Sequence, residues 1–211
     1  MNKYFLYFFL FLIPVLGLGL DLKGHWALEK SEITYTVTHP LHVVKGKAVS
    51  PIKVTKGNGA NAVIELTFPT KGKGVCYSGH NEFHVGVLVD SFDSGDKNRD
   101  LHMLQVTKAG LYPLIDVKAD FKEKDGRISL PGQVAADFTI QFAGKTVKYP
   151  NVNLEMTAWN SGGAHLLATL RLKLRDFEIQ PPSLLTMPVQ DEVPVRLDMF
   201  WKHVDSKELK K

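Results

Sequence analysis

Cysteine is almost absent from this sequence. Among 211 residues the only one is Cys76, and a single thiol cannot form a disulfide within the chain. Small exported domains with weak cores usually depend on disulfides. A chain of this length can instead bury a sizeable core in one domain, so we expect packing to supply its stability.

The sequence also lacks any block of like charge. Lys and Arg total 26, Asp and Glu total 22, and the formal net charge is +4. Nucleic-acid-binding proteins carry a clustered basic face, whereas the two signs are interspersed here, so we expect no nucleic-acid partner. The mild positive excess is compatible with transient contact with an anionic membrane surface.

The one long apolar run stands at the start of the chain. It has a single cation, Lys3, an interruption at Pro14 and two late glycines, Gly17 and Gly19. This order is typical of a secretory signal peptide, and the run is too short to suit the alternative, an uncleaved membrane anchor. We therefore predict a cleaved signal peptide over residues 1–19, one domain over residues 20–202 and a charged tail over residues 203–211.

Long helical patterns are missing from residue 25 onward, and alternation of apolar and polar residues takes their place. Such alternation is typical of strands with one buried face and one wet face. In "EITYTVTH", the residues Ile33, Tyr35, Val37 and His39 share one face. Similar runs lie at residues 61–68, 83–89, 115–121, 134–142, 166–175 and 195–201.

Turn-rich segments such as "KGNGAN", "FAGKT" and "NSGG" separate these runs. No gap has the pattern of the helix that a parallel crossover needs, so we predict an all-β, antiparallel fold of about eight strands. Short helices are expected in the approach to "LHMLQVTK" (residues 101–108), after the acidic stretch, and at "SLLTMPVQ" (residues 183–190). A two-sheet sandwich would show the same alternation, but closing the sheet removes its edges, which favours a β-barrel with an apolar lumen.

In a closed barrel the alternation selects the side chains that face the lumen. We predict this position, and contact with any bound ligand, for Tyr35, Val37, Phe83, Val85, Val87, Phe138, Ile140, Leu170 and Leu172. In a fully packed interior the same residues would contact one another, and a register error of one residue would exchange the faces.

Two segments carry partial metal-site patterns. The oxygens of "DKNRD" (residues 96–100) match the first three ligand positions of a calcium loop, but the glycine and final glutamate of that loop are missing. Cys76, His80 and His84 share one strand parity and could offer a thiolate and two imidazoles to zinc, although their spacing fits no closed zinc site. A metal-binding protein therefore stays open as the alternative function.

No catalytic constellation stands out. Ser161 in "WNSGGAH" lacks the glycine that precedes a nucleophilic serine and the helix that follows it. The sequence also offers no convincing acid and base pair. We predict a non-enzymatic protein without a cofactor.

Several segments, taken in order, resemble the YceI-like family. They are "ITYTVTH", "VDSFDSGDKNRDLHML" leading to "YPLIDVKADF", "FTIQFAGKTVKYPNVNLEM" and "LRLKLRDFEIQPPSLL". The best anchors are Arg99-Asp100, Tyr112-Pro113 and Arg175-Asp176-Phe177, and the resemblance covers residues 25 to 202. The sequence departs from the family pattern at Phe92, Ser94 and Glu178, and Glu178 stands where glycine usually follows the phenylalanine.

The resemblance implies an extended antiparallel barrel of lipocalin-like form in the periplasm. It also implies that the lumen carries or stores an apolar polyisoprenoid or isoprenoid-quinone-type lipid. We expect such a lipid as the partner, and the sequence leaves open whether two barrels form a homodimer.

We expect structural roles for five polar or aromatic residues of these motifs. Asp93, Arg99 and Asp100 are expected to fix the acidic segment by ion pairs and turn caps, and Arg175 and Phe177 are expected to be structural.

Two histidines receive a ligand role. His39 and His102 are expected at the mouth or inside the barrel, where they could meet a polar head group. The alternative for each is a hydrogen-bonded wall residue.

Overall fold

The computed structural model describes residues 18–21, 24–49, 52–54, 63–66, 82–122, 127–159, 162–184 and 186–204. Within these ranges there is one α-helix, α1 (Lys97–Val106), and there are two 3-10 helices, η1 (Val89–Ser91) and η2 (Leu174–Phe177). None of the helices described has the length and apolar content needed to cross a bilayer. The strands are β1 (Leu18–Asp21), β2 (Gly24–His39), β3 (His42–Val49), β4 (Ile52–Val54), β5 (Val63–Leu66), β6 (Glu82–Leu88), β7 (Leu114–Phe121), β8 (Arg127–Leu130), β9 (Gly132–Phe142), β10 (Lys145–Trp159), β11 (Gly163–Lys173), β12 (Ser183–Leu184), β13 (Met187–Pro188) and β14 (Glu192–Val204).

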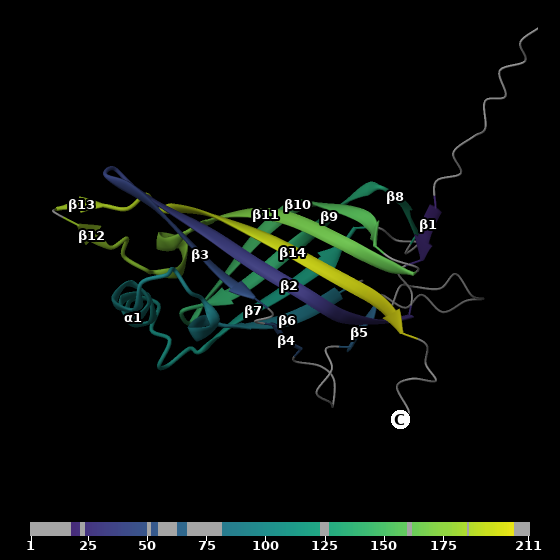
Figure 1. Cartoon of the computed structure of the whole chain (residues 1–211), viewed down its shortest axis with the longest axis horizontal. Coiled ribbons are helices and arrows are strands. Elements are labelled where there is room, and N and C mark those ends of the chain that lie inside the picture. The colour runs from purple at the N-terminus through teal and green to yellow at the C-terminus, as the bar shows by residue number, and fades with distance from the viewer. Residues whose placement is uncertain are drawn as a thin grey trace, which may run out of the picture.

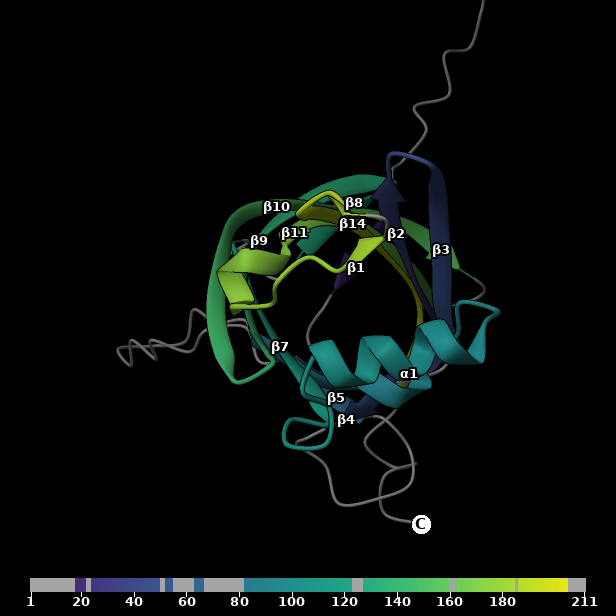
Figure 2. The same ribbon diagram turned by 90° about the vertical axis from the view of Figure 1, so that its left-hand side faces the viewer.

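Most strands belong to one ten-stranded sheet with the order β3-β2-β14-β11-β10-β9-β7-β6-β4, in which β5 also pairs with β2. Its pairings are antiparallel. The long strands run side by side in Figure 1, and Figure 2 shows them curling round a common axis. The predicted antiparallel, barrel-like fold is confirmed, as a curled sheet whose ladder ends at β3 and β4.

The turn between β9 and β10 explains one of the glycine-containing segments. Ala143 and Gly144 both have positive φ, 50° and 81°, as in the mirror-image turns whose twist matches that of two antiparallel strands. A Cβ at Gly144 would also lie 2.6 Å from the Cζ atom of Tyr112. Glycine is therefore required by the backbone angle and by the ring that packs over it.

A bulge interrupts β10. Its register against β9 shifts between Tyr149 and Val152, and Asn151 between them has a φ of 55°. Pro150 lies in this irregular stretch, where the ladder tolerates a residue without an N–H. The backbone N–H of Asn151 donates to Asp137 Oδ1 at 2.8 Å, which holds the bulge against β9.

Of the two expected helices, one is confirmed and one is wrong. The first is α1, which begins at Lys97, where Asp96 caps it. Residues 183–190 form the β12–β13 hairpin instead of a helix. Pro188 cannot donate a helical hydrogen bond, and the backbone N–H of Gln190 instead donates to Thr38 O at 2.8 Å, which ties the segment to β2.

One half of the interior is densely packed. The inward side chains of this half belong to β7, β9, β10, β11 and β14, and each is at most 9% exposed. They are Phe121, Val134, Ala136, Leu154, Met156, Leu166, Ala168, Met199 and Trp201. The candidate site lies in the other half, next to α1.

Candidate functional site

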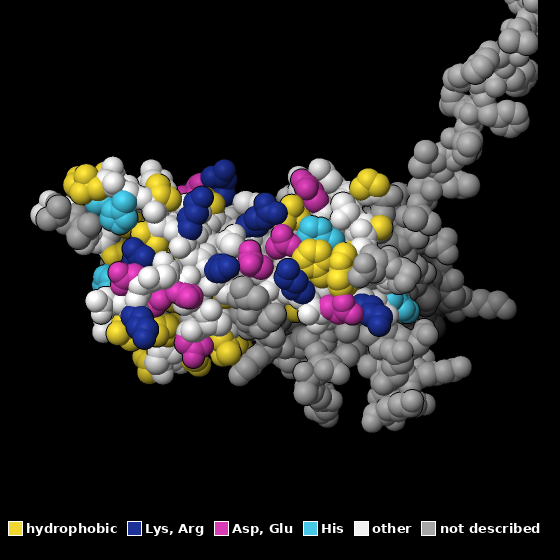
Figure 3. Space-filling model, viewed as in Figure 1, with side chains coloured by type: hydrophobic (Ala, Val, Ile, Leu, Met, Phe, Trp, Pro, Cys, Tyr) yellow, Lys and Arg dark blue, Asp and Glu magenta, His cyan; other side chains and the backbone are white. Residues whose placement is uncertain are grey.

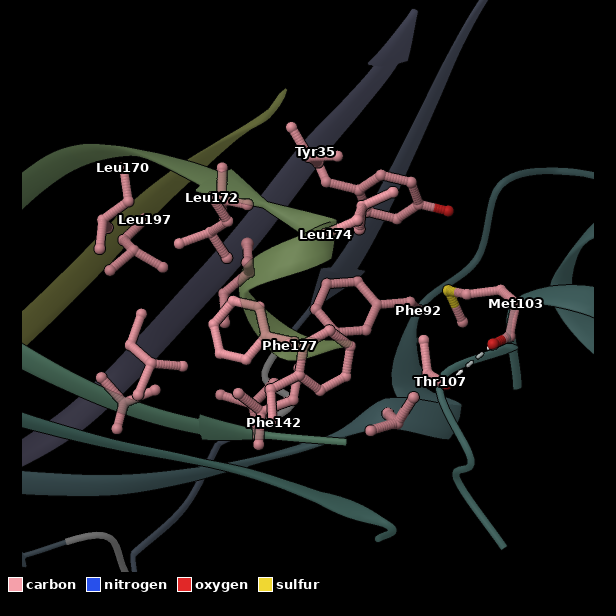
Figure 4. Close-up of a pocket in the computed structure, with 18 of the residues that line it drawn as sticks. Tyr35, Phe92, Met103, Thr107, Phe142, Leu170, Leu172, Leu174, Phe177 and Leu197 are labelled. Atoms are coloured by element: carbon pink, nitrogen blue, oxygen red, sulfur yellow. Dashed lines mark hydrogen bonds between the residues drawn. The ribbon is translucent and has the colours of Figure 1, made fainter. Parts of the chain in front are cut away.

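A cavity of about 170 Å³ occupies the barrel interior beside α1. Strands β2, β6, β7, β9, β11 and β14 form its side wall, and α1, η1 and η2 contribute to its end. Among its described lining residues only Tyr35 and Thr107 have polar side-chain atoms, and none is charged. Figure 4 shows leucines and phenylalanines from strands, from η2 and from the connection after η1 pointing toward one another around this space.

The alternation in the sequence builds the cavity wall directly. Side chains two positions apart on a strand point to the same face, and on β11 these are Leu170 and Leu172, with Leu174 following in η2. On β14 they are Val193, Val195 and Leu197. Polar neighbours such as Arg171 and Arg196 are exposed on the outer face.

The end of the cavity is covered by α1, which lies across that end of the barrel in Figure 2. Met103 and Thr107 of the α1 segment line the cavity and are four residues apart, so they share one helix face. The Thr107 hydroxyl donates to Met103 O at 2.8 Å, so its hydrogen-bonding need is met inside its own segment. The helix face that covers the cavity therefore behaves as an apolar surface, because the Thr107 hydroxyl is already hydrogen-bonded within its own segment.

The acidic segment before α1 is a set of turn and cap contacts. Asp96 Oδ1 accepts from the backbone N–H groups of Asn98 at 2.9 Å and Arg99 at 3.0 Å, and Asp93 Oδ1 accepts from Gly95 N at 2.7 Å. The hydrogen bond to the Arg99 N–H, more than that to Asn98, holds the pKa of Asp96 below its ordinary value. The segment thus sets where α1 begins.

Two further contacts fasten this segment. Asp100 Oδ1 accepts from Ser94 N at 3.0 Å, while Arg99 donates from Nε to Ser94 Oγ at 3.1 Å and from Nη2 to Ser94 O at 3.0 Å. Lys47 and Asp93 exchange two backbone hydrogen bonds of 2.9 Å, which join the segment to β3. Asp93 and Asp100 therefore act through turn contacts, and Arg99 acts through its bonds to Ser94.

Tyr35 is the only tyrosine among the described residues of the cavity wall. Its ring meets Phe92 edge to face, with centroids 5.6 Å apart. Burial is the main cause that raises the pKa of Tyr35, and the Asp100 and Asp93 carboxylates add to it, while the Arg99 guanidinium opposes it. The neutral phenol is thus the favoured form beside an apolar space.

The η2 segment contributes to the end of the cavity together with α1. Phe177 is buried and meets Phe142 edge to face at a centroid distance of 5.5 Å. The backbone N–H of Arg175 donates to Asp191 Oδ1 at 2.9 Å. Glu178 follows with a φ of 55°, which explains why glycine is the usual residue of the family at this position.

Neither predicted head-group histidine lines the cavity. His39 is buried, its Nδ1 accepts from Leu41 N at 3.2 Å and its Nε2 lies 3.0 Å from Met187 O. These two contacts fix the tautomer with the proton on Nε2 and match the alternative of a hydrogen-bonded wall residue. His102 is exposed on α1, away from the face that bears Met103.

The structure brings together most of the residues predicted for the lumen. Those on the cavity wall are Tyr35, Val37, Val87, Phe138, Ile140, Leu170 and Leu172. Phe83 and Val85 have the strand parity of Val87 in β6, but their side chains lie outside the described part of the chain. Contact of all these residues with a ligand stays a prediction.

Sequence reasoning missed the end wall of the cavity. Phe92, Met103 and Phe177 come from connections and helices, where no alternation marks the inward face. A four-residue spacing of Met103 and Thr107 is the one local signal that could have found a covering helix face. Ile33, Val117, Val195 and Leu197 belong to the same alternating runs as the predicted residues and could have been named with them.

The described geometry gives little support to the two metal-binding hypotheses. Among the described residues no group of three or more His, Cys, Asp or Glu side chains is placed to hold a metal ion. Cys76 and His80 lie outside the described residues, as does the side chain of His84.

The curled antiparallel sheet and its apolar cavity define an extended, lipocalin-like barrel class of protein. The model of the YceI-like domain family matches residues 26–200, so the chain belongs to that family. No curated protein matches the chain.

Several solved structures match the fold of this chain, and two of them cover more than four fifths of it. One is a polyisoprenoid binding domain from Saccharophagus degradans implicated in plant cell wall breakdown, at 13% identity and a TM-score of 0.63, covering 85% of this chain and 98% of that one. The other is BcnA of Burkholderia cenocepacia, at 15% identity and a TM-score of 0.58, covering 81% of this chain and 95% of that one.

Proposed function

We propose that this protein binds an apolar lipid of the polyisoprenoid or isoprenoid-quinone type in the cavity beside α1, as a non-enzymatic carrier or store. The observation that carries the proposal is a cavity wall without a charged side chain among its described residues. The polyisoprenoid-binding domain that shares the fold supports the choice of lipid class. Binding of this kind needs no catalytic residue.

The energetics are sufficient. Each buried CH₂ group contributes about 0.8 kcal/mol, so a five-carbon isoprene unit contributes about 4 kcal/mol. Association costs roughly 4–15 kcal/mol, and a cavity that exists before binding keeps the cost toward the low end. Two isoprene units in this preformed space would contribute about 8 kcal/mol, which exceeds the low end of that cost.

The test is native mass spectrometry of protein purified without detergent, followed by extraction and identification of the released molecule and by metal analysis of the same sample. A stoichiometric apolar molecule with a five-carbon repeat supports the proposal. Stoichiometric zinc or calcium without lipid would support the metal-binding alternative instead.

A pair of adjacent residues in β11 supplies matched variants. Leu172→Trp fills the cavity, whereas Arg171→Trp adds the same ring to the outer face. Loss of bound lipid in Leu172→Trp, with retention in Arg171→Trp, would assign binding to the lumen. Equal lipid content in the two variants contradicts that assignment.

We also propose export to the periplasm after cleavage of residues 1–19. The order of charge, apolar residues and glycines at the start of the chain supports it. In the uncleaved chain Leu18 and Gly19 pair with Leu130 and Ser129 of β8, so cleavage would shorten β1. The mass of protein recovered from the periplasm of a Gram-negative host decides whether the chain begins at Leu20 or Met1.

Transient contact with a membrane would let the cavity exchange lipid. Support comes from the exposed large apolar residues, which gather at the end of the barrel that carries α1 and the β2–β3 hairpin: Leu41, Val43, Leu101, Leu111 and Tyr112. Hydrophobic side chains also show at this end in Figure 3. Flotation with uncharged phosphatidylcholine vesicles should weaken in Leu111→Asp but not in Thr169→Asp, a change on the outer wall.

A further inference from the structure

We infer that the cavity binds only the end of an apolar chain, about one or two isoprene units. Phe138 forms the floor that limits the depth of the cavity. This inference rests on the proposed function, because it specifies how much of a lipid the lumen holds. It follows from the size of the cavity, from the position at which its lining stops on each strand, and from the packing below that position.

The cavity is small for a long lipid. Its volume is about 170 Å³. A buried apolar cavity of about 150 Å³ in another protein binds a single benzene molecule, with six carbons. The space beside α1 therefore suits about five to ten carbons and cannot enclose a long polyisoprenoid in the conformation described.

The lining stops at a packed layer on three strands, β9, β11 and β14. The last inward residue that lines the cavity is Phe138 on β9, Leu170 on β11 and Leu197 on β14. The next inward residues on these strands, Ala136, Ala168 and Met199, belong to the packed core. On each of these strands the cavity therefore ends where the packed core begins.

Phe138 is the residue at which the lining ends on β9. Its side chain is completely buried, and it faces Ala119, its partner in the β7–β9 ladder. One layer deeper the order reverses, since Phe121 of β7 faces Ala136 of β9. Large and small residues thus alternate across the ladder, which lets neighbouring layers of side chains interlock.

The chain beyond the first units has to leave past α1. Met103 and Thr107 cover that end of the cavity, and the carbons outside them gain little burial from the barrel. Affinity should therefore rise with chain length only until the cavity is full.

The test uses linear isoprenoid alcohols of five, ten, fifteen and twenty carbons, titrated by calorimetry into the purified protein freed of bound lipid. Affinity should rise at least about tenfold from the five-carbon to the ten-carbon alcohol and change less than about threefold from fifteen to twenty carbons. A continued tenfold rise per unit up to twenty carbons would overturn the length limit and leave the carrier function intact. Absence of binding at every length would overturn the proposed function itself.

Two phenylalanine variants test whether Phe138 forms the floor of the cavity. Phe138→Leu shortens the floor residue and should move the plateau toward longer chains by about one unit. Phe177→Leu makes the same change in a buried residue at the other end of the cavity and should leave the plateau unmoved. If both variants shift the plateau equally, Phe138 is not the floor.

A filling variant keeps the test decisive if Phe138→Leu does not fold. Leu197→Phe adds volume at the floor from β14 and should move the plateau toward shorter chains, so that the ten-carbon alcohol binds no better than the five-carbon one. An unchanged length profile in Leu197→Phe overturns the inference.

Discussion

The ring of Tyr35 lies over the backbone of Gly46, its direct partner in the β2–β3 ladder. A Cβ placed on Gly46 would overlap the ring atoms of Tyr35. The glycine thus leaves room for an aromatic side chain that both covers the edge strand and lines the cavity. One cross-strand pair connects the stability of β3 with the shape of the candidate site.

Gly46→Ala should displace Tyr35 and destabilise the protein by about 1–3 kcal/mol, the usual cost of overpacking. The double variant Gly46→Ala/Tyr35→Ala should be less destabilised than the sum of the two single changes, because the overlap is gone. Urea unfolding of the four proteins in this cycle measures the coupling. Strict additivity would show that the two residues do not constrain each other.

Ser31 presents a buried hydroxyl without a partner. The residue is 1% exposed, and its Oγ has no hydrogen bond in the part of the chain described. Ser31→Ala should therefore stabilise the protein by about 1 kcal/mol, since an unsatisfied buried polar group costs about 1–3 kcal/mol. Ser91→Ala is the control, because Ser91 Oγ donates to Leu88 O at 2.5 Å and its loss should destabilise. Destabilisation in both variants would contradict the assignment.

Asp96 should be required for the start of α1. Asp96→Ala removes two hydrogen bonds to backbone N–H groups and should lower the melting temperature by about 2–4 °C. Asp96→Asn keeps an accepting oxygen and should lose less. Because the folded state lowers the pKa of Asp96 below 3.8, its stabilisation is complete above that value and is lost as the pH falls through the lowered pKa. Thermal melts of the three proteins at neutral and acidic pH measure both effects, and parallel pH profiles would contradict the cap.

Glu178 occupies a left-handed backbone position. Its φ is 55°, and its carboxylate pairs with Lys145 Nζ at 2.6 Å. Glu178→Gly and Glu178→Ala both remove this ion pair, but only glycine relieves the backbone conformation. The glycine variant should therefore melt about 2–4 °C above the alanine variant. Equal melting temperatures would show that the backbone at this position is unstrained.

Prediction from sequence succeeded where one strand face was buried throughout. Period-two alternation located β9, β11, β14 and residues 31–39 of β2, because the inward residues keep one parity there, whereas a register shift moves the inward parity of β2 to Leu28. It did not reveal β10, because the bulge at Asn151 shifts the inward parity between Tyr149 and Val152.

Tertiary contacts decided the remaining elements. The β12–β13 hairpin replaced an expected helix because its backbone is held by Thr38 and by the His39 ring. The size of the cavity could not be predicted from the alternation either. On β9 the same alternation places Ala136 in a packed layer and Ile140 on the cavity wall. Side-chain volume across the whole barrel, and not the pattern of any strand, makes that difference.

Tyr149 should make the protein sensitive to strongly alkaline pH. Burial is the main cause that raises its pKa from 10.0 to about 12, the nearby Asp176 carboxylate adds to it, and the backbone of Lys173 opposes it. The unfolded chain ionises its tyrosine near pH 10, while the folded chain still holds the proton, so the folded state binds more protons between these values. Stability from this group is therefore complete below pH 10, falls as the pH rises and is lost by about pH 12. Tyr149→Phe cannot ionise, so its urea midpoint should decline less than that of the parent protein over this window, and equal declines would place the alkaline sensitivity elsewhere.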